Sequence, residues 1–174
     1  MSRILHKAQL TGTLAVALVA VSGMGLRVAL ADQESASPEH ARYLQASLSG
    51  NYAFVGTYAA NVAANLGVMT FDGLGGVKGS VIVNQPAANG LRALVKVTVS
   101  GTYSVNSNGT GVIAFTVTFA DGHTADVTED FVITHAESRG DVLIATSIFD
   151  AQEQPSVVIS GNVFVTHTYT RRPD

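Results

Sequence analysis

After Gly50, apolar and polar residues alternate with a period of two along most of the chain, and this pattern predicts strands. Residues 91–105 give the clearest example. Their odd-numbered positions from 95 onward are mostly valine or tyrosine, whereas the even-numbered positions are lysine, threonine and serine. Eight stretches of this kind are rich in Val, Ile, Thr, Phe and Tyr and are separated by Gly, Asn, Asp and Pro. The predicted strands are residues 51–58, 66–72, 76–84, 91–105, 111–119, 124–135, 141–149 and 156–170.

No sustained helical period follows Gly50, so the chain lacks the crossover helices that a parallel sheet requires. The sheet is therefore expected to be antiparallel. One short helix is predicted upstream, over residues 39–48. Ser37 is a suitable N-cap for it, Pro38 suits the first helical position, and Gly50 ends the pattern.

Three predicted connections, residues 73–75, 107–109 and 120–122, each contain three residues and end in glycine. This form is typical of a type I turn followed by a residue with positive φ, where glycine carries no steric cost. Each turn fixes the register of its hairpin, and the apolar residues then gather on one side of the sheet. The predicted partners are Phe71 with Val77, Tyr103 with Ile113, Val99 with Val117, Phe115 with Val127, and Ile113 with Glu129.

Eight consecutive antiparallel strands, each with one apolar face, are enough to close into a small barrel without exposed edges. Gly79, Gly101 and Gly161 interrupt the apolar faces of their predicted strands. Glycines at such positions let long, strongly bent strands turn a barrel corner. A two-sheet β-sandwich is the alternative arrangement for this number of strands.

The first thirty-one residues have the three parts of a secretory signal peptide. Arg3 and Lys7 form a positive start, residues 14–21 are apolar, and residues 29–31 offer an A-x-A cleavage site. The apolar part is too short to span a bilayer as a stable helix, although an N-terminal anchor helix is the alternative. The mature protein is thus expected to begin near Asp32, after cleavage near Ala31, and to be secreted or periplasmic. Residues 32–49 then form a tether and the short helix, and residues 50–174 form the barrel.

The amino-acid composition argues against several classes of binding partner and of chemistry. Three of the ten basic residues and none of the thirteen acidic ones lie in the leader, which leaves the mature chain with a formal net charge of −6. An acidic surface without basic clusters argues against nucleic acid or anionic lipid as a partner. The chain contains no cysteine, which excludes disulfides, thiolate chemistry and a lipid-modified cysteine. No membrane insertion is expected after cleavage, and the sequence does not set the oligomeric state.

Several short runs resemble a known group of proteins. They are residues 50–54 (GNYAF), 70–75 (TFDGLG) with Gly79, and 101–106 (GTYSVN) with 109–111 (GTG). These runs are similar to those of secreted bacterial proteins of unknown function whose small barrels are like those of lipocalins and allene oxide cyclases. The resemblance covers most of residues 50–119 and implies a barrel. It transfers no active site, because no catalytic residue of the cyclases matches a position here and the chain has no tryptophan for a lipocalin signature.

The alternation also places polar residues among the predicted inward-facing ones. In strand 124–135, Glu129 and His135 share the face of the apolar residues, and in the last strand His167 and Tyr169 do the same. Burial would raise the pKa of Glu129, as a general acid or base at neutral pH requires. The alternatives are that Glu129 lies at a bulge and points outward, or that it is a structural acid bonded to a buried hydroxyl such as that of Tyr103.

Other chemical motifs are missing from the sequence. His123, His135 and His167 have no metal-ligand spacing, and no metal or cofactor is expected. No serine lies in a nucleophile-elbow pattern, and the glycines at 73–76 are not followed by the helix that a phosphate-binding loop needs.

The sequence therefore predicts an exported small barrel that binds a small, largely apolar molecule in its interior. One alternative is an enzyme resembling a cyclase or isomerase, in which a buried Glu129 transfers a proton. The other is a structural or interaction protein with a solid barrel. The candidate ligand-binding residues are Glu129, His135, His167, Tyr103, Phe115 and Phe131.

Overall fold

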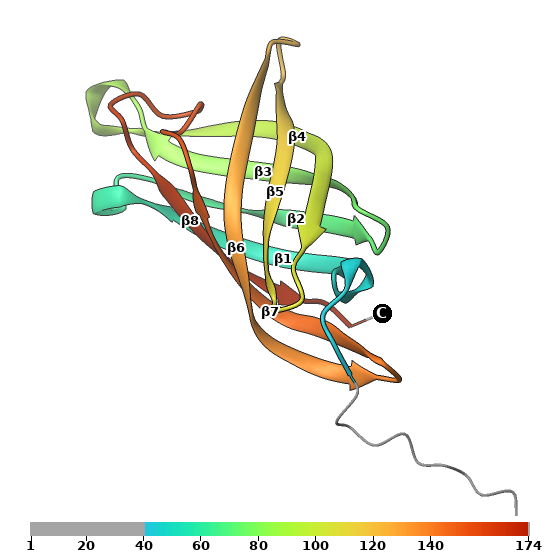
Figure 1. Cartoon of the computed structure of the whole chain (residues 1–174). Coiled ribbons are helices and arrows are strands. Elements are labelled where there is room, and N and C mark those ends of the chain that lie inside the picture. Colours follow the sequence, from blue (N-terminus) through green and yellow to red (C-terminus); the bar gives the residue numbers. More distant parts are fainter. Residues whose placement is uncertain (1–40, 174) are drawn as a thin grey trace, which may run out of the picture. The chain divides into compact units, whose positions relative to one another are not determined.

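The computed structural model describes residues 41–173, so the predicted signal peptide and residues 32–40 of the predicted tether and helix lie outside the described residues. Each strand runs antiparallel to the next along the chain, and β8 pairs with β1, which closes the sheet into a barrel (Figure 1). The strands are β1 (Ser49–Tyr58), β2 (Ala64–Asp72), β3 (Gly76–Pro86), β4 (Arg92–Val105), β5 (Thr110–Phe119), β6 (Thr124–Arg139), β7 (Val142–Gln152) and β8 (Val165–Arg171).

The closed sheet confirms the predicted eight-stranded antiparallel barrel, and it excludes the alternative β-sandwich. The glycines that end the three predicted turns all have positive φ: 115° at Gly75, 84° at Gly109 and 88° at Gly122. The registers that these turns set are confirmed. The pairs are Phe71 with Val77, Tyr103 with Ile113, Val99 with Val117, Phe115 with Val127, and Ile113 with Glu129.

Gly101, on the inner face of β4, has the predicted role of letting its strand bend. A Cβ on Gly101 would collide with the carbonyl oxygen of Ala114 and the Cα of Phe115 on the neighbouring strand. The absence of a side chain therefore lets β4 and β5 bend closely together.

The last strand begins later than predicted. β8 starts at Val165, and residues 153–164 form an irregular connection, which we call the covering segment. Ser156 Oγ accepts hydrogen bonds from the backbone N–H groups of Val158 and Ile159, and Gly161 and Asn162 have positive φ. These local bonds and left-handed residues are incompatible with an extended strand. Gly161 was therefore wrongly predicted to lie on a strand.

The predicted N-terminal helix is also wrong over the part that the structure describes. Arg42 forms an isolated parallel bridge with Val142, and only the 3-10 turn η2 (Gln45–Ser47) follows. Contacts between this segment and the barrel explain why no helix forms. The Gln45 side chain donates to the Tyr103 carbonyl at 2.5 Å and accepts from the Val105 N–H at 3.2 Å, while Leu48 is fully buried. Contacts with the barrel thus replace the bonds of a helix.

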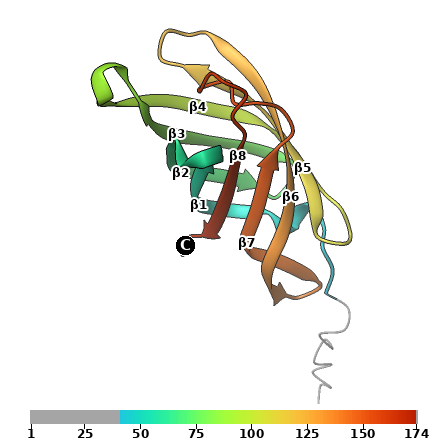
Figure 2. The same ribbon diagram turned by 90° about the vertical axis from the view of Figure 1, so that its left-hand side faces the viewer.

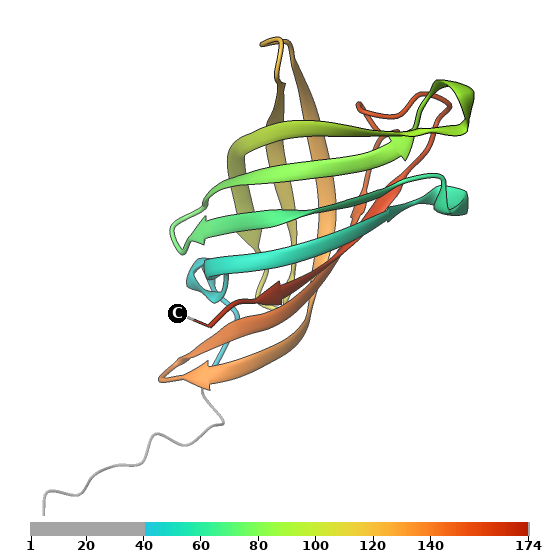
Figure 3. The same cartoon turned by 180° about the vertical axis from the view of Figure 1, so that it is seen from behind.

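The two ends of the barrel differ. The covering segment lies between β7 and β8 at the end that also carries the β3–β4 connection (Figure 2). The turn η2 lies at the opposite end (Figure 3). Buried aromatic and aliphatic side chains pack in the interior between them; those almost completely shielded from solvent include Tyr52, Tyr169, Phe71, Leu48, Met69 and Ile113. Within residues 41–173, no helix combines the length and the apolar character needed to cross a bilayer.

Candidate functional site

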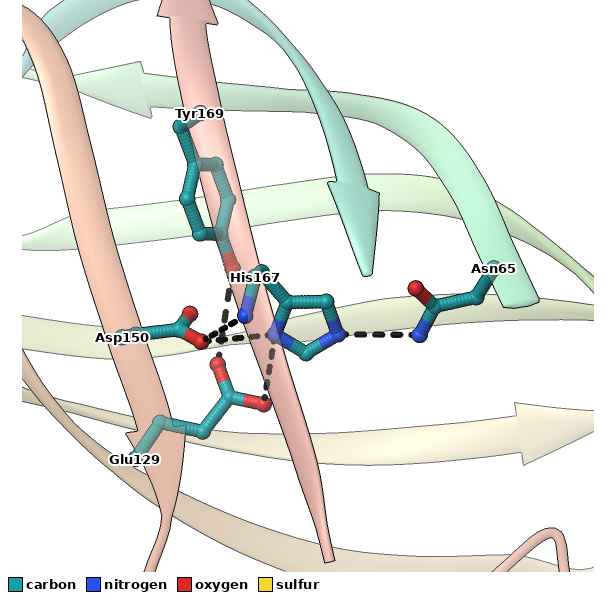
Figure 4. Close-up of polar contacts among 5 residues, drawn as sticks. All are labelled: Asn65, Glu129, Asp150, His167 and Tyr169. Carbon is teal, nitrogen blue, oxygen red and sulfur yellow. Dashed lines mark hydrogen bonds and ion pairs between the residues drawn. The ribbon is translucent and has the colours of Figure 1, made fainter. Parts of the chain in front are cut away.

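Five polar side chains meet inside the barrel, and we call them the interior polar cluster. Its members are Asn65 from β2, Glu129 from β6, Asp150 from β7, and His167 and Tyr169 from β8 (Figure 4). All five are buried, and Glu129 has no exposed surface. Titratable groups are rarely buried to this extent without a partner or a function, so the cluster is the candidate site.

Strand pairing explains why these residues meet. Asp150 is the direct partner of His167 across β7 and β8, while Glu129 on β6 is opposite Gln152, two residues after Asp150. Side chains two residues apart on a strand share a face, so Glu129 and Asp150 become diagonal neighbours.

The approach of Asn65 to His167 depends on a glycine between them. Gly56 on β1 pairs with Asn65 on one side and with His167 on the other. A Cβ at Gly56 would collide with Asn65 Oδ1 and His167 Cδ2. The two side chains therefore reach across β1 through space that only glycine leaves free.

The ring of His167 has a partner at each nitrogen. Asp150 Oδ1 accepts hydrogen bonds from the His167 backbone N–H at 2.9 Å and from its Nδ1 at 2.7 Å. Asn65 Nδ2 lies 2.9 Å from His167 Nε2. An amide nitrogen only donates, so in this arrangement Nε2 accepts and the ring proton is on Nδ1.

Glu129 is less fully bonded. Its Oε1 lies 3.6 Å from His167 Nδ1, which is an ion-pair distance rather than a hydrogen bond, and its Oε2 is 3.4 Å from the Tyr169 hydroxyl. Burial raises the pKa of Glu129 well above its ordinary value, and repulsion from Asp150 raises it further. Burial, followed by the neighbouring carboxylates, likewise raises the pKa of Tyr169. The cluster thus favours a neutral Glu129 and a neutral Tyr169.

A cavity of about 40 Å³ adjoins the cluster. Asn65, Glu129, His167 and Tyr169 line it on one side, and Ser156, Val157 and Val158 of the covering segment also line it. Its remaining walls are mainly apolar side chains, among them Met69, Val83, Val99, Phe115, Val117 and Val127.

Three buried oxygens of cavity-lining residues have no hydrogen-bond partner: Asn65 Oδ1, Glu129 Oε1 and Gln152 Oε1. Asp150 Oδ2, also in the cluster, is likewise unpartnered. An unsatisfied buried polar atom costs about 1–3 kcal/mol, and native proteins keep few of them. The site therefore offers hydrogen-bond acceptors inside an apolar space.

The six predicted site residues lie in different places. Glu129, His167 and Phe115 line the cavity. Tyr103 and Phe131 are buried but are not among its lining residues, and the Tyr103 hydroxyl donates to the Leu48 carbonyl at 2.7 Å instead of to Glu129. The predicted inward direction of His135 is wrong, because the β6–β7 register shifts at His135 and leaves its side chain exposed.

Two members of the cluster were missed from the sequence, although a signal was present for each. Asp150 continues the inward alternation of Ile148, but the predicted strand stopped at residue 149. Asn65 precedes the inward Met69 and Phe71 by an even number of residues, but the predicted strand began at residue 66. In both cases a polar residue at a strand end was assigned to a loop.

Comparisons with known proteins show no family to which the chain belongs. No protein-family model matches the sequence, and no curated protein matches it either. A solved structure of a redesigned β-barrel aligns with 75% of this chain and 96% of its own length, at 11% sequence identity and a TM-score of 0.47.

Proposed function

We propose that this protein is an exported barrel that binds a small, largely apolar molecule in its interior. The single observation that carries the proposal is the set of buried, unpartnered acceptors on an otherwise apolar cavity: Asn65 Oδ1, Glu129 Oε1 and Gln152 Oε1. Ligand pockets combine an apolar lining with a few placed polar groups in this way. A hydroxyl or amine of the ligand would donate to these oxygens, and its hydrocarbon part would contact the valines.

The size of the cavity limits the ligand. A water needs about 10–15 Å³ of such space, so a cavity of about 40 Å³ holds only a few waters. Any organic ligand beyond a few heavy atoms therefore requires the covering segment to move. Backbone bonds hold this segment at both ends, from Glu153 N–H to the Thr128 carbonyl at 3.0 Å and from Ala59 N–H to the Phe164 carbonyl at 2.9 Å. Ser156–Val158, which lie between these bonds, are the expected entrance.

The first experiment is native mass spectrometry of the protein purified from its own host. We expect a co-purifying small molecule on the wild type, its retention in the control Asp130→Asn, and its loss in Glu129→Ala. Asp130 is an acidic residue on the same strand whose side chain is exposed, so this control tests the loss of a carboxyl group that lies outside the cavity. A second pair tests the cavity itself: Val158→Phe fills it from the covering segment and should remove the ligand, whereas Ser160→Phe, at an exposed position, should not.

A direct measurement of ligand binding complements the mass spectrometry. Isobutanol and isobutylamine should raise the melting temperature of the wild type, because each can donate a hydrogen bond to the free cavity oxygens. The absence of any adduct, together with no stabilisation by either donor ligand, would overturn the proposal. The structural or interaction role predicted from the sequence would then be the better account.

A proton-transfer enzyme is the second candidate, and the raised pKa of Glu129 beside the Asp150–His167 pair favours it. Such an enzyme would exchange a carbon-bound hydrogen of its ligand with solvent. The co-purified molecule should then gain deuterium when it is incubated in D₂O with the wild type, and not with Glu129→Gln. A ligand that binds without exchange would exclude this activity and leave the binding function.

Export is proposed on the predicted signal peptide alone. The intact mass of the protein recovered from its host tests it directly, and we expect a chain that begins near Asp32. A full-length chain retained in the cytoplasm would contradict export without affecting the binding proposal.

A further inference from the structure

We propose that Glu129, Asp150 and His167 form a binding site for one divalent first-row transition-metal ion, ligated by two carboxylates and one imidazole. Sequence spacing gave no sign of a metal site, because its three ligands come from three different strands. The inference does not depend on the binding of a small molecule.

The distances suit a metal ion. One ligand atom from each of the three residues lies within 4.8 Å of the others. His167 Nδ1 and Glu129 Oε1 are 3.6 Å apart. Two ligand atoms that each lie about 2.1 Å from a tetrahedral Zn²⁺ are about 3.4 Å apart, so this pair needs little adjustment. The 2.7 Å contact between His167 Nδ1 and Asp150 Oδ1 is a hydrogen bond, whose proton the ion would replace.

Unpartnered atoms provide an independent observation. Glu129 Oε1 and Asp150 Oδ2 belong to side chains that are 0% and 1% exposed, and neither atom has a hydrogen-bond partner. In the described part of the chain, His167 is the only basic side chain within ion-pair distance of either carboxylate. A divalent cation that displaced the carboxyl protons would have its two positive charges balanced by the two ligand carboxylates.

The neighbouring residues are those that a metal-bound histidine requires. When Nδ1 binds the ion, Nε2 carries the proton and must donate it. Rotation of the Asn65 amide would bring the unpartnered Oδ1 to this position in place of Nδ2. The Tyr169 hydroxyl, 3.4 Å from Glu129 Oε2, is placed to donate to a ligand carboxylate. The cavity beside Glu129 and His167 has room for the waters that would complete the coordination.

The ligand set indicates the class of ion. One imidazole with two carboxylates suits Zn²⁺, Mn²⁺ or Fe²⁺, whereas Ca²⁺ and Mg²⁺ prefer oxygen ligands alone. Zn²⁺ and Mn²⁺ are therefore the probes, with Ca²⁺ as the comparison ion.

The test is calorimetric titration of the full mature protein after dialysis against EDTA, with no organic ligand present. We expect one Zn²⁺ or Mn²⁺ per chain and little binding of Ca²⁺. Glu129→Gln and Asp150→Asn keep the size of the side chain and should each weaken affinity at least about tenfold. Two control variants should leave the affinity for the metal ion unchanged. Asp130→Asn removes an exposed carboxylate from β6, and His123→Ala removes the exposed histidine that contacts Asp121.

A wild-type measurement keeps the inference testable if a variant fails to fold. Substoichiometric Mn²⁺ should broaden the NMR signals of the His167 ring protons and leave those of His123 and His135 sharp. Failure to bind Zn²⁺ or Mn²⁺ at one per chain would overturn the inference, and so would broadening at the exposed histidines alone. Because only ions are titrated, this outcome is separate from that of the small-molecule experiments.

Discussion

Asp150 and His167 are direct partners across β7 and β8, and one oxygen of the aspartate, Oδ1, accepts hydrogen bonds from both the backbone N–H and the ring Nδ1 of the histidine. The two bonds fix the backbone and the ring of His167 together. As a result, Nδ1 faces the carboxylates and Nε2 faces Asn65. The orientation of this ring is the geometric basis of the proposed metal site.

Replacement of Glu129 by glutamine should change how stability depends on pH in the metal-free protein. The pKa of Glu129 is raised in the folded state, so the native protein keeps a proton that the unfolded chain releases above its ordinary value of 4.5. The carboxyl therefore lowers the free energy of unfolding as pH rises from that value through the folded pKa, by up to about 1.4 kcal/mol per pH unit. Urea denaturation in EDTA between about pH 5 and 7 should show the wild type losing stability relative to Glu129→Gln. The control Asp130→Asn should show the same pH dependence of the free energy of unfolding as the wild type. If the wild type and Glu129→Gln show the same pH dependence, Glu129 is not buried as a neutral acid.

Asp72 is expected to make stability depend on pH in the opposite direction. Its Oδ1 accepts hydrogen bonds from the backbone N–H groups of Leu74 at 2.7 Å and Gly76 at 2.8 Å, and these bonds lower its pKa below the ordinary 3.8. The stabilisation is present above that value and is lost as pH falls through the folded pKa. Acid unfolding should therefore be less steep for Asp72→Asn than for the wild type. Equal steepness would mean that the 73–75 turn does not depend on this carboxylate.

Addition of a methyl group at Gly56 should separate Asn65 from His167. Because the new Cβ would overlap both side chains, we expect Gly56→Ala to lower the free energy of unfolding by about 1–3 kcal/mol and to shift the His167 ring signals in NMR spectra. Ala53→Val adds carbon atoms to the same strand at an exposed position and should change neither quantity. An unperturbed His167 ring in Gly56→Ala would show that the approach across β1 is looser than described.

Removal of the Tyr103 hydroxyl should loosen the N-terminal turn and leave the cavity intact. This hydroxyl donates to the carbonyls of Leu48 at 2.7 Å and Gln45 at 3.1 Å. Tyr103→Phe leaves both carbonyls without this partner, and we expect a loss of about 1–3 kcal/mol. Hydrogen exchange should become faster at the amides of Ser47 and Leu48, whose bonds close η2. A change in ligand or metal binding in this variant would instead return Tyr103 to the site, as predicted from the sequence.

The features of the fold that could be predicted from the sequence depend on interactions between residues close together in the chain. The turns that end at Gly75, Gly109 and Gly122 need positive φ, and they set the register of three hairpins. The register of the β5–β6 hairpin placed Glu129 opposite Ile113, and alternation then turned the carboxyl inward. One buried acid of the site was therefore predictable from one turn and one strand.

The rest was decided by contacts between segments far apart in the chain. Pairing of β1 with β8 brings Gly56 next to His167, and the bulge in β6 turns His135 outward although its position in the sequence alternation is inward. Contacts of Gln45 and Leu48 with the barrel likewise replace the predicted helix over residues 41–48 with an irregular segment. A period of two specifies only which side of a strand a residue occupies. The meeting of Asn65, Asp150 and His167 requires the registers of several strand pairs together, and only closure of the barrel fixes them.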